Sequence, residues 1–322
     1  METLLYLSAQ DVASLDLPMA QVIAAVEDVF REKGEGRLEM PPKPGIHPAP
    51  DAFIHAMPAY LPALRAAGMK WVGGYPGNRE RGLPYISGLL VLNDPETGLP
   101  VCVMDATWMT AKRTGAATAV GAKYLARPDS EVLGILGCGV QGRSHLEALA
   151  EGFALHRVVA YDPDPQALHR YAAEARERFG LEVVEAQTPR QAVSGCDLVV
   201  TAGPLLRTPH ATIRAGWLDA GAFAGAVDFD SYWHADALAQ VDAFCCDDRG
   251  QLDYYRSLGY FRAIPEVRAD LGELVTGVAA GRRFKNERTM ACLLGLAAED
   301  VALGALVYAG AQRAGIGTRL PL

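Results

Sequence analysis

The stretch GILGCGVQGRSHLEAL, residues 134–149, decides the fold of the larger part of the chain, because it places Gly137-x-Gly139-x-x-Gly142 between a strand-like run and a helix. In such a turn the first glycine permits a tight reversal, the second lets the backbone approach a pyrophosphate, and the third allows close helix–strand packing. The helix that follows offers free N–H groups to phosphates. The stretch predicts a dinucleotide site. The alternative is a glycine-rich turn in an α/β core that binds nothing.

Residues 131–245 around this stretch alternate short β-branched runs with helical patterns. The runs are EVLGILG, RVVAYD, LEVVEA, CDLVVTAG and GAFAGAV, and helices are expected up to Gly152, up to Phe179 and, as a short segment, before CDLVVTAG. This alternation is typical of a parallel sheet covered by helices on both faces. We therefore expect an α/β fold with a doubly wound Rossmann domain over residues 128–297.

Asp162 ends the second of these runs, 20 residues after Gly142. An acid at this position bonds the ribose hydroxyls of NAD and repels the 2′-phosphate of NADP. Pro163 follows, and no arginine close behind it could neutralise a phosphate. NAD is therefore favoured over NADP. The alternative is that Asp162 caps the helix that begins near Pro165.

The rest of the chain has a different texture. A helix is expected over Met19 to Lys33, strands over 69–74, 85–92 and 100–104, and a helix from Thr107 to Arg127 that ends before Pro128. The turn NDPETG joins the last two strands as a hairpin. After helical stretches beyond Asp247, an amphipathic helix over 298–314 and the tail GIGTRLPL are expected to return to the first domain. Residues 1–127 and 298–322 then form an α+β domain.

Composition excludes several classes of protein. The chain has 322 residues, half of them hydrophobic, which is enough for a large core in two domains. Its net charge is −8 and it contains no basic run, so neither nucleic acid nor an anionic membrane is an expected partner. No signal peptide or membrane span is recognised, which predicts a cytoplasmic protein. The six cysteines lack CxxC spacing, and no metal-binding constellation is expected.

The segment MDATWMTAKRTGAATAV, residues 104–120, is apolar and rich in small residues, yet it contains Arg113. A guanidinium in apolar surroundings can bind a carboxylate through two parallel hydrogen bonds. Lys70 and Lys43 supply two more cations. We expect these residues to bind the carboxylate of a substrate that meets the nicotinamide ring from the other domain. The alternative is an internal ion pair of Arg113 with a carboxylate such as Asp105.

Two stretches of the sequence, residues 70–127 and LGILGCGVQGRSHLEAL, resemble the ornithine cyclodeaminase and mu-crystallin family. The likeness runs from about residue 19 to the end and includes HAMPAYL (55–61), DLGELVTG (270–277) and GLAAEDVALGALVY (295–308). The resemblance implies a homodimer. It also implies that the split first domain forms the substrate site and the dimer interface, and that the Rossmann domain binds the nucleotide.

The resemblance also implies roles for single residues. Lys70 and Arg113 match the family's substrate-carboxylate and cofactor-contacting positions. Lys43 stands where many members have an arginine. A lysine offers a single point charge in place of the two parallel hydrogen bonds of a guanidinium. The positions that match cofactor-binding residues are Gly137, Gly139, Val140, Gln141, Gly142, Asp162, Thr201 and Arg113.

The family's catalytic acid follows the strand AFAGAV, which makes Asp228 the candidate. Many members read Gly-Ala-Asp and then Pro-Gly-Lys-x-Glu-Leu, whereas this chain inserts Val227 and continues Phe-Asp-Ser-Tyr-Trp. The departure leaves Asp230 as a rival acid and removes a lysine that contacts the cofactor in some members. Leu293 stands where some members have a serine. The alternative for either aspartate is a helix cap before residues 231–237.

The activity that the resemblance implies is that of an ornithine cyclodeaminase with bound NAD. Hydride leaves the α-carbon of L-ornithine, the distal amine closes the ring, ammonia is lost, and the same hydride returns to give L-proline. Asp228 would take the proton of the reacting ammonium, while Lys70 and Arg113 fix the α-carboxylate. Two alternatives stay open. One is an NAD(P)-dependent amino acid dehydrogenase or cyclic ketimine or imino acid reductase, and the other is a non-catalytic ligand carrier.

Overall fold

The computed structural model describes residues 3–322. It divides into two compact units, unit 1 with Met1–Arg113 and Leu296–Leu322, and unit 2 with Thr114–Gly295. One division falls inside helix α3 (Thr107–Leu125), whereas the sequence places the domain boundary at the end of this helix. A continuous helix contains no linker, so the chain passes from one unit to the other without a break in secondary structure. Each unit is described by itself below.

Unit 2 is built on an eight-stranded sheet in the order β13-β12-β14-β11-β10-β7-β8-β9, with every pair parallel. Its strands are β7 (Val132–Leu136), β8 (Arg157–Tyr161), β9 (Glu182–Glu185), β10 (Leu198–Thr201), β11 (Phe223–Ala226), β12 (Ala243–Cys246), β13 (Val267–Asp270) and β14 (Thr289–Cys292). All residues of β10, β11, β12 and β14 are buried, as expected for strands covered on both faces. The doubly wound fold is confirmed.

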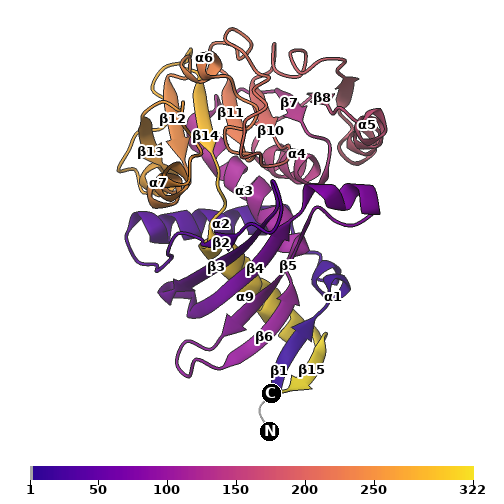
Figure 1. Ribbon diagram of the computed structural model, residues 1–322, viewed down its shortest axis with the longest axis vertical. Helices are drawn as coiled ribbons and strands as arrows, with labels where there is room; N and C mark the ends of the chain where they lie inside the picture. The colour runs from indigo at the N-terminus through magenta and orange to yellow at the C-terminus, as the bar shows by residue number, and fades with distance from the viewer. Residues whose placement is uncertain (1–2) are drawn as a thin grey trace. The chain divides into compact units, whose positions relative to one another are not determined.

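The strand order of unit 2 reverses at β7, which has β8 on one side and β10 on the other. In parallel sheets ligands bind beyond the carboxyl ends of the strands at such a switch point. The helices of this unit are α4 (Val140–Gly152), α5 (Pro165–Phe179), α6 (Ala235–Leu238), α7 (Arg249–Ser257) and α8 (Leu271–Val275), and Figure 1 labels most of them. The glycine turn begins directly after β7, so it lies at this switch point.

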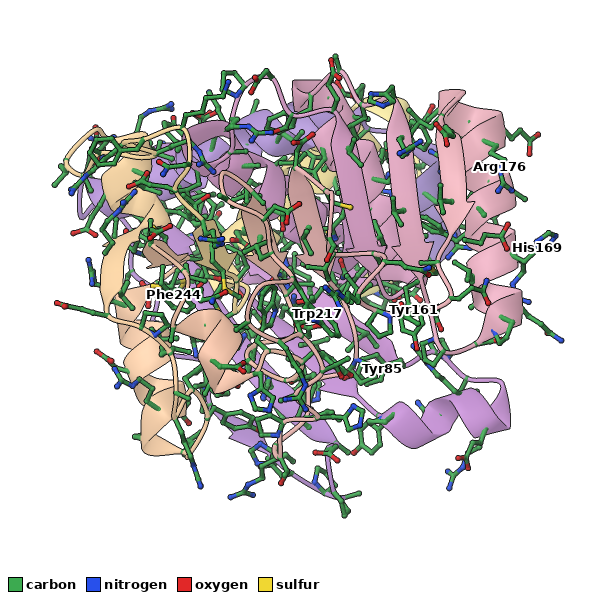
Figure 2. The ribbon with its side chains drawn as sticks, turned by 90° about the horizontal axis from the view of Figure 1, so that it is seen from above. Tyr85, Tyr161, His169, Arg176, Trp217 and Phe244 are labelled. Atoms are coloured by element: carbon green, nitrogen blue, oxygen red, sulfur yellow. The ribbon has the colours of Figure 1, made fainter. Side chains whose placement is uncertain are left out.

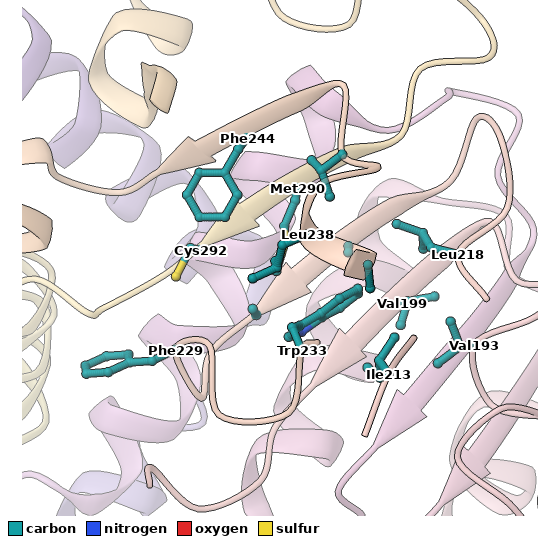
Figure 3. Packing of buried hydrophobic residues seen from close by; sticks show 14 of the residues in the cluster. Val193, Val199, Ile213, Leu218, Phe229, Trp233, Leu238, Phe244, Met290 and Cys292 are labelled. Carbon is teal, nitrogen blue, oxygen red and sulfur yellow. The ribbon is translucent and has the colours of Figure 1, made fainter. Parts of the chain in front are cut away.

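Two expectations for unit 2 are wrong. Residues 189–195 form successive turns with hydrogen bonds between residues three or four apart instead of the short helix. Beyond Asp247 the chain adds β13 and β14 as well as the expected helices. These strands have four residues each, too short for a clear alternation in the sequence. Their side chains join the large buried cluster of unit 2, part of which Figure 3 shows.

Unit 1 contains a seven-stranded sheet in the order β15-β1-β6-β5-β4-β3-β2. The strands are β1 (Thr3–Leu7), β2 (Gly45–Ile46), β3 (Phe53–Leu61), β4 (Ala66–Gly74), β5 (Ile86–Asn93), β6 (Pro100–Asp105) and β15 (Thr318–Pro321). The pairs are antiparallel except for β1 with β6. The expected hairpin of β5 and β6 is present, and β15 pairs with β1, so both ends of the chain share one sheet (Figure 1).

Helices of unit 1 are α1 (Ala9–Ser14), α2 (Met19–Gly34), α9 (Ala297–Ala314) and the short 3-10 turns η1 (Pro62–Leu64) and η2 (Pro76–Arg81). Helix α9 packs on β3, β4 and β5, and α2 packs on α9. Gly304 makes this possible, because a Cβ there would lie 2.1 Å from the Leu90 side chain. Within residues 3–322 no helix has both the length and the apolar character needed to cross a bilayer.

The sheet face of unit 1 that points away from α9 is apolar and exposed. Strand alternation places Lys70 and Leu90 toward α9 and Trp71 and Leu89 on the other face, where each is 45% exposed. Trp71 is the register partner of both Ala56 and Leu89. A second row on this face contains Pro58, Met69, Val91, Val103 and Tyr6. We call this surface the open sheet face.

Candidate active site

The glycine turn after β7 has the geometry that a bound pyrophosphate needs. Gly137 has φ +108°, a conformation that side chains rarely tolerate, and a Cβ there would lie 2.6 Å from the Ala202 carbonyl oxygen. A Cβ on Gly142 would lie 2.3 Å from the Gly137 oxygen. Gly139 is the N-cap of α4, makes no side-chain cap, and has no atom within 4 Å of the place of a Cβ. The backbone is therefore open to a ligand at this end of α4.

Val140 and Gln141 begin α4, so their N–H groups point toward the N-terminal end of the helix. The Val140 side chain is exposed. The Gln141 carbonyl oxygen accepts a hydrogen bond from Nδ1 of the buried His145 at 2.7 Å, one turn further on. The positive end of the helix dipole therefore faces open space, which suits a pyrophosphate.

Asp162 follows β8, whose last residue Tyr161 is labelled in Figure 2. Its Oδ2 accepts a hydrogen bond from the Cys138 N–H at 2.8 Å, and its Oδ1 accepts one from the Asp164 N–H at 2.9 Å. The cap of α5 is Asp164, which accepts from the Gln166 N–H. The capping alternative for Asp162 is therefore wrong. Each of its carboxylate oxygens keeps a lone pair for a ribose hydroxyl.

Asp228 lies just beyond β11 and is fully buried. Its Oδ1 accepts a hydrogen bond from the Thr201 hydroxyl at 2.7 Å, and its Oδ2 accepts one from the Gly203 N–H at 2.9 Å. Burial raises the pKa of Asp228 to about 7, although both hydrogen bonds oppose the rise and Asp230 adds to it. This carboxyl group can therefore give or take a proton near neutral pH.

Asp230 lies in the same segment but in a different setting. It is buried, burial raises its pKa, and its Oδ1 makes no hydrogen bond within residues 3–322. The N-cap of α6 is His234, so neither aspartate caps that helix, and the capping alternative is wrong. Leu293 is buried, and its N–H donates to the Ala226 carbonyl oxygen at 2.9 Å. It has no polar side-chain atom to offer a ligand.

Unit 1 contains a separate cluster around Lys70, which is fully buried on β4. Lys70 Nζ lies 2.5 Å from Asp300 Oδ2 and donates to the Thr110 hydroxyl at 3.3 Å. Burial lowers the pKa of Lys70 to about 8; Asp300 opposes the change and Arg113 adds to it. The ammonium group is therefore retained at neutral pH, although little water surrounds it.

Arg113 joins the same cluster from α3. Its Nε donates to Asp300 Oδ1 at 3.3 Å, and its Nη1 donates to Glu299 Oε2 at 3.4 Å. Arg113 therefore forms an internal ion pair, as the alternative expected, but its partners are Asp300 and Glu299 and not Asp105. Asp105 instead accepts hydrogen bonds from the Thr107 N–H and hydroxyl at the start of α3.

Lys43 and His55 lie near this cluster in unit 1, and both are buried. Burial lowers the pKa of His55 to about 3, and the charges of Lys43 and Lys70 add to the change. His55 is therefore neutral and stacks on Phe53 at a ring-centroid distance of 4.2 Å. The three cations expected to bind a carboxylate therefore lie in unit 1, with Lys43 and Lys70 both close to His55 and Arg113 close to Lys70.

The sequence did not single out Glu299, Asp300, Thr110 or Trp233, whose indole N–H donates to the Thr201 oxygen at 3.2 Å. The first two form the charged pair in GLAAEDVALGALVY, where two fully buried carboxylates interrupt an apolar helix. Buried carboxylates require cationic partners, and this rule could have linked them to Arg113. Within residues 3–322 no three histidine, cysteine or acidic side chains gather as a metal site would require.

Comparison with known proteins identifies the family. A sequence model described as "Ornithine cyclodeaminase/mu-crystallin family" matches residues 2–315. The chain belongs to this family. The nodulation efficiency protein NfeD of Rhizobium meliloti is 38% identical over 315 residues, 97% of each chain. The alanine dehydrogenase of Archaeoglobus fulgidus is 35% identical over 99% of this chain and 98% of that protein.

Solved structures of similar proteins agree with the fold. The Δ1-pyrroline-2-carboxylate reductase of Thermococcus litoralis, in complex with NADH and L-proline, matches with a TM-score of 0.90 and 33% identity, over 98% of this chain and all of that one. An archaeal alanine dehydrogenase dimer with bound NAD matches with a TM-score of 0.88 and 33% identity over both whole chains. These relatives are enzymes. The chain is an enzyme of this family, either a lyase or an oxidoreductase.

Proposed function

We propose that the chain is an NAD-dependent oxidoreductase that reduces the C=N bond of a 2-imino acid to the amino acid and catalyses the reverse oxidation. The observation that carries this proposal is the buried carboxyl group of Asp228, whose pKa of about 7 suits a proton donor to nitrogen. Reduction of an imine needs one hydride at carbon and one proton at nitrogen. The roles of the chain's residues follow from their contacts.

The nucleotide is assigned to the glycine turn of unit 2. Gly137, Gly139 and Gly142 allow the backbone to approach a pyrophosphate, and the positive N-terminal end of α4, where Val140 and Gln141 lie, faces its charge. Bound NADH supplies the hydride in one direction, and bound NAD accepts it in the other.

Two further residues of unit 2, Asp162 and Thr201, have roles beside the glycine turn in this proposal. Asp162 accepts the ribose hydroxyls and disfavours NADP. Thr201 orients Asp228 beside the nucleotide, because its hydroxyl is bonded to Oδ1 at 2.7 Å.

The substrate carboxylate is assigned to Lys70, Arg113 and Lys43 of unit 1. Asp300 and Glu299 balance two of these charges and keep the Lys70 and Arg113 side chains in fixed positions. In the proposal the substrate carboxylate is a further anionic partner of these cations. In buried surroundings a charge-assisted hydrogen bond to a carboxylate is strong, so substrates that lack this group should bind poorly.

The proton is assigned to Asp228. In reduction its carboxylic acid donates a proton to the nitrogen while carbon receives the hydride, and the products are the amino acid, NAD and the Asp228 carboxylate. In oxidation the carboxylate takes the proton back. Asp230 is the weaker candidate, because the Thr201 hydroxyl donates to Asp228 instead and, within residues 3–322, Oδ1 of Asp230 makes no hydrogen bond. Atoms and charges balance in both directions.

A cyclodeaminase is the second candidate, because the family includes that chemistry. Such an enzyme uses the same first oxidation, then loses ammonia and returns the hydride, so no net change in NADH occurs. The relatives reported above include an alanine dehydrogenase and a Δ1-pyrroline-2-carboxylate reductase, which are oxidoreductases. This likeness favours the oxidoreductase.

A homodimer formed through the open sheet face is part of the proposal. Trp71 and Leu89 lie side by side there with nearly half their surface exposed, within an apolar area that spans five strands. A second copy of the chain would cover it. Replacement of Trp71 by lysine should convert the dimer to a monomer in sedimentation, whereas an unchanged mass would reject this interface. The cytoplasmic location expected from the sequence stays a prediction.

The function is tested with the purified protein and a panel of substrates. Δ1-pyrroline-2-carboxylate and the imino acids formed from pyruvate with ammonia are offered with NADH, and L-ornithine and L-lysine are offered with NAD. We expect stoichiometric NADH consumption with at least one imino acid. Ammonia released from a diamino acid without a net change in NADH would identify a cyclodeaminase.

A further inference from the structure

We infer that Trp233 is a positioning residue that fixes which oxygen of Asp228 carries the catalytic proton. The inference deepens the proposed function, since it assumes that Asp228 is the proton donor. It rests on one short chain of hydrogen bonds inside unit 2. The indole N–H of Trp233 donates to the Thr201 oxygen at 3.2 Å, and the Thr201 hydroxyl donates to Asp228 Oδ1 at 2.7 Å.

The direction of this chain follows from the chemistry of its groups. An indole nitrogen can only donate a hydrogen bond, so the Thr201 oxygen is the acceptor of the first bond. A hydroxyl has one hydrogen, and that of Thr201 is therefore free to point at Asp228. Oδ1 of Asp228 receives it and is an acceptor. When Asp228 is protonated, its own proton must lie on Oδ2.

Oδ2 is suited to that task. It accepts the Gly203 N–H at 2.9 Å and keeps a second position for a proton. Without Trp233 the Thr201 hydroxyl could rotate, and the proton could occupy either oxygen of the carboxyl group. The indole therefore excludes the arrangement with the proton on Oδ1 before the substrate binds. The proton donor is then already oriented for the reaction.

Packing fixes the indole itself. Trp233 is buried, and Figure 3 shows its ring lying near Ile213 and Leu238 of the same buried cluster. The backbone N–H of Trp233 bonds the Asp230 carbonyl oxygen, and residue 233 forms a bridge with Ile213. The turn through Phe229, which has φ +62°, brings Trp233 back to Thr201. This is the segment in which the chain departs from the family pattern.

The charged and titratable neighbours of Asp228 do not take the place of the hydrogen bonds from Trp233 and Thr201. Asp230 lies on the same segment, and Cys292 at the end of β14 lies close enough for its thiol to sense Asp228, Asp230 and Asp247. Burial raises the pKa of Cys292, so this thiol stays neutral. Within residues 3–322 the side-chain hydrogen bond to Asp228 Oδ1 comes from Thr201.

The test compares Trp233→Phe with Trp217→Phe. Both substitutions remove an indole N–H from unit 2 and leave an aromatic ring, but the bonds that link Trp233, Thr201 and Asp228 do not involve Trp217. Trp233→Phe should lower kcat about 5- to 10-fold, the effect of one well-placed hydrogen bond, with KM and NADH affinity unchanged. Trp217→Phe should behave as the wild type. In a Thr201→Val background Trp233→Phe should cause no further loss.

A second readout does not depend on turnover. The Asp228 carboxyl is titrated by NMR in protein made with isotope-labelled aspartate, with Asp228→Asn to assign the signal. Its midpoint should rise in Trp233→Phe and Thr201→Val and stay in place in Trp217→Phe, because a fixed donor stabilises the carboxylate. An unshifted midpoint would overturn the inference. A shifted midpoint in a protein without imino acid reduction would reject the proposed function and leave the inference standing.

Discussion

Lys70 and Asp300 form a fully buried ion pair, with 2.5 Å between Nζ and Oδ2, that joins β4 to the first turn of α9. These residues are distant in sequence and lie in the two chain segments that make up unit 1. Asp300 also accepts from Arg113, so one carboxylate orients two cations. The proposed carboxylate site is therefore built around an internal counter-ion.

Replacement of this counter-ion should destabilise the protein. Asp300→Asn leaves Lys70 and Arg113 buried without their main partner, which should lower the free energy of unfolding by about 3 kcal/mol. Glu96→Gln breaks the exposed pair with Arg65 and should cost less than about 1 kcal/mol. Denaturant unfolding measures both. Equal stabilities of the two variants would contradict the role of Asp300.

Loss of Lys70 should weaken substrate binding and leave NADH binding unchanged. Lys70→Met keeps the apolar stem and removes the charge, so KM for the imino acid should rise about 10- to 100-fold, as expected for one charge-assisted hydrogen bond. The dissociation constant of NADH, measured by fluorescence, should stay the same. A variant with unchanged KM would move the substrate carboxylate elsewhere.

Asp228 should control the pH dependence of the reaction. Reduction needs the protonated acid, so kcat should fall as the pH rises through about 7, whereas kcat for oxidation should rise over the same range. Asp228→Asn should lose about 100-fold or more in kcat, lose this pH dependence and still bind NADH. A larger loss in Asp230→Asn than in Asp228→Asn would transfer the role to Asp230.

Asp228 should also affect stability with a definite sign. Its pKa in the folded protein, about 7, lies above its ordinary value of 3.8, so the folded state binds more protons between these values. The free energy of unfolding should therefore fall as the pH rises from about 4 to 7, and this contribution should vanish in Asp228→Asn. The difference between wild type and variant, measured by unfolding at each pH, isolates the effect. A difference that does not change with pH would contradict the raised pKa.

Asp162 should set the choice of nucleotide. Asp162→Ser removes the carboxylate that disfavours a 2′-phosphate, so affinity for NADH should fall and affinity for NADPH should rise. Asp164→Ala removes only the cap of α5 and should leave the ratio of the two affinities unchanged. If both variants keep the wild-type ratio, the ribose contact is assigned to the wrong residue.

The fold could be predicted where its causes are local. The spacing of Gly137, Gly139 and Gly142 predicts a tight turn from only six residues. The periodicity of the apolar residues around it predicts the strand before the turn and the helix after it. The short strands β13 and β14 could not be found in this way, because four buried residues show no alternation. Asp162 was recognised for the same local reason as the glycines.

The partners in the candidate site were harder to predict because they are distant in sequence. Arg113 and Asp300 are separated by 187 residues, and only the folded chain brings them together. Asp105 was the expected partner because it is close to Arg113 in sequence. The actual partner, Asp300, is brought close by the packing of α9 on the sheet. Trp233 could not be assigned either, because an indole in an apolar segment gives no sign of its hydrogen bond.

One measurement tests the central claim most directly. The purified protein is mixed with NADH and Δ1-pyrroline-2-carboxylate, and NADH absorbance and L-proline are followed together in the wild type and in Asp228→Asn. The proposal predicts that one L-proline forms for each NADH consumed by the wild type, and that the variant is nearly inactive. Absence of NADH consumption with this and the other imino acids, together with ammonia release from L-ornithine, would contradict it.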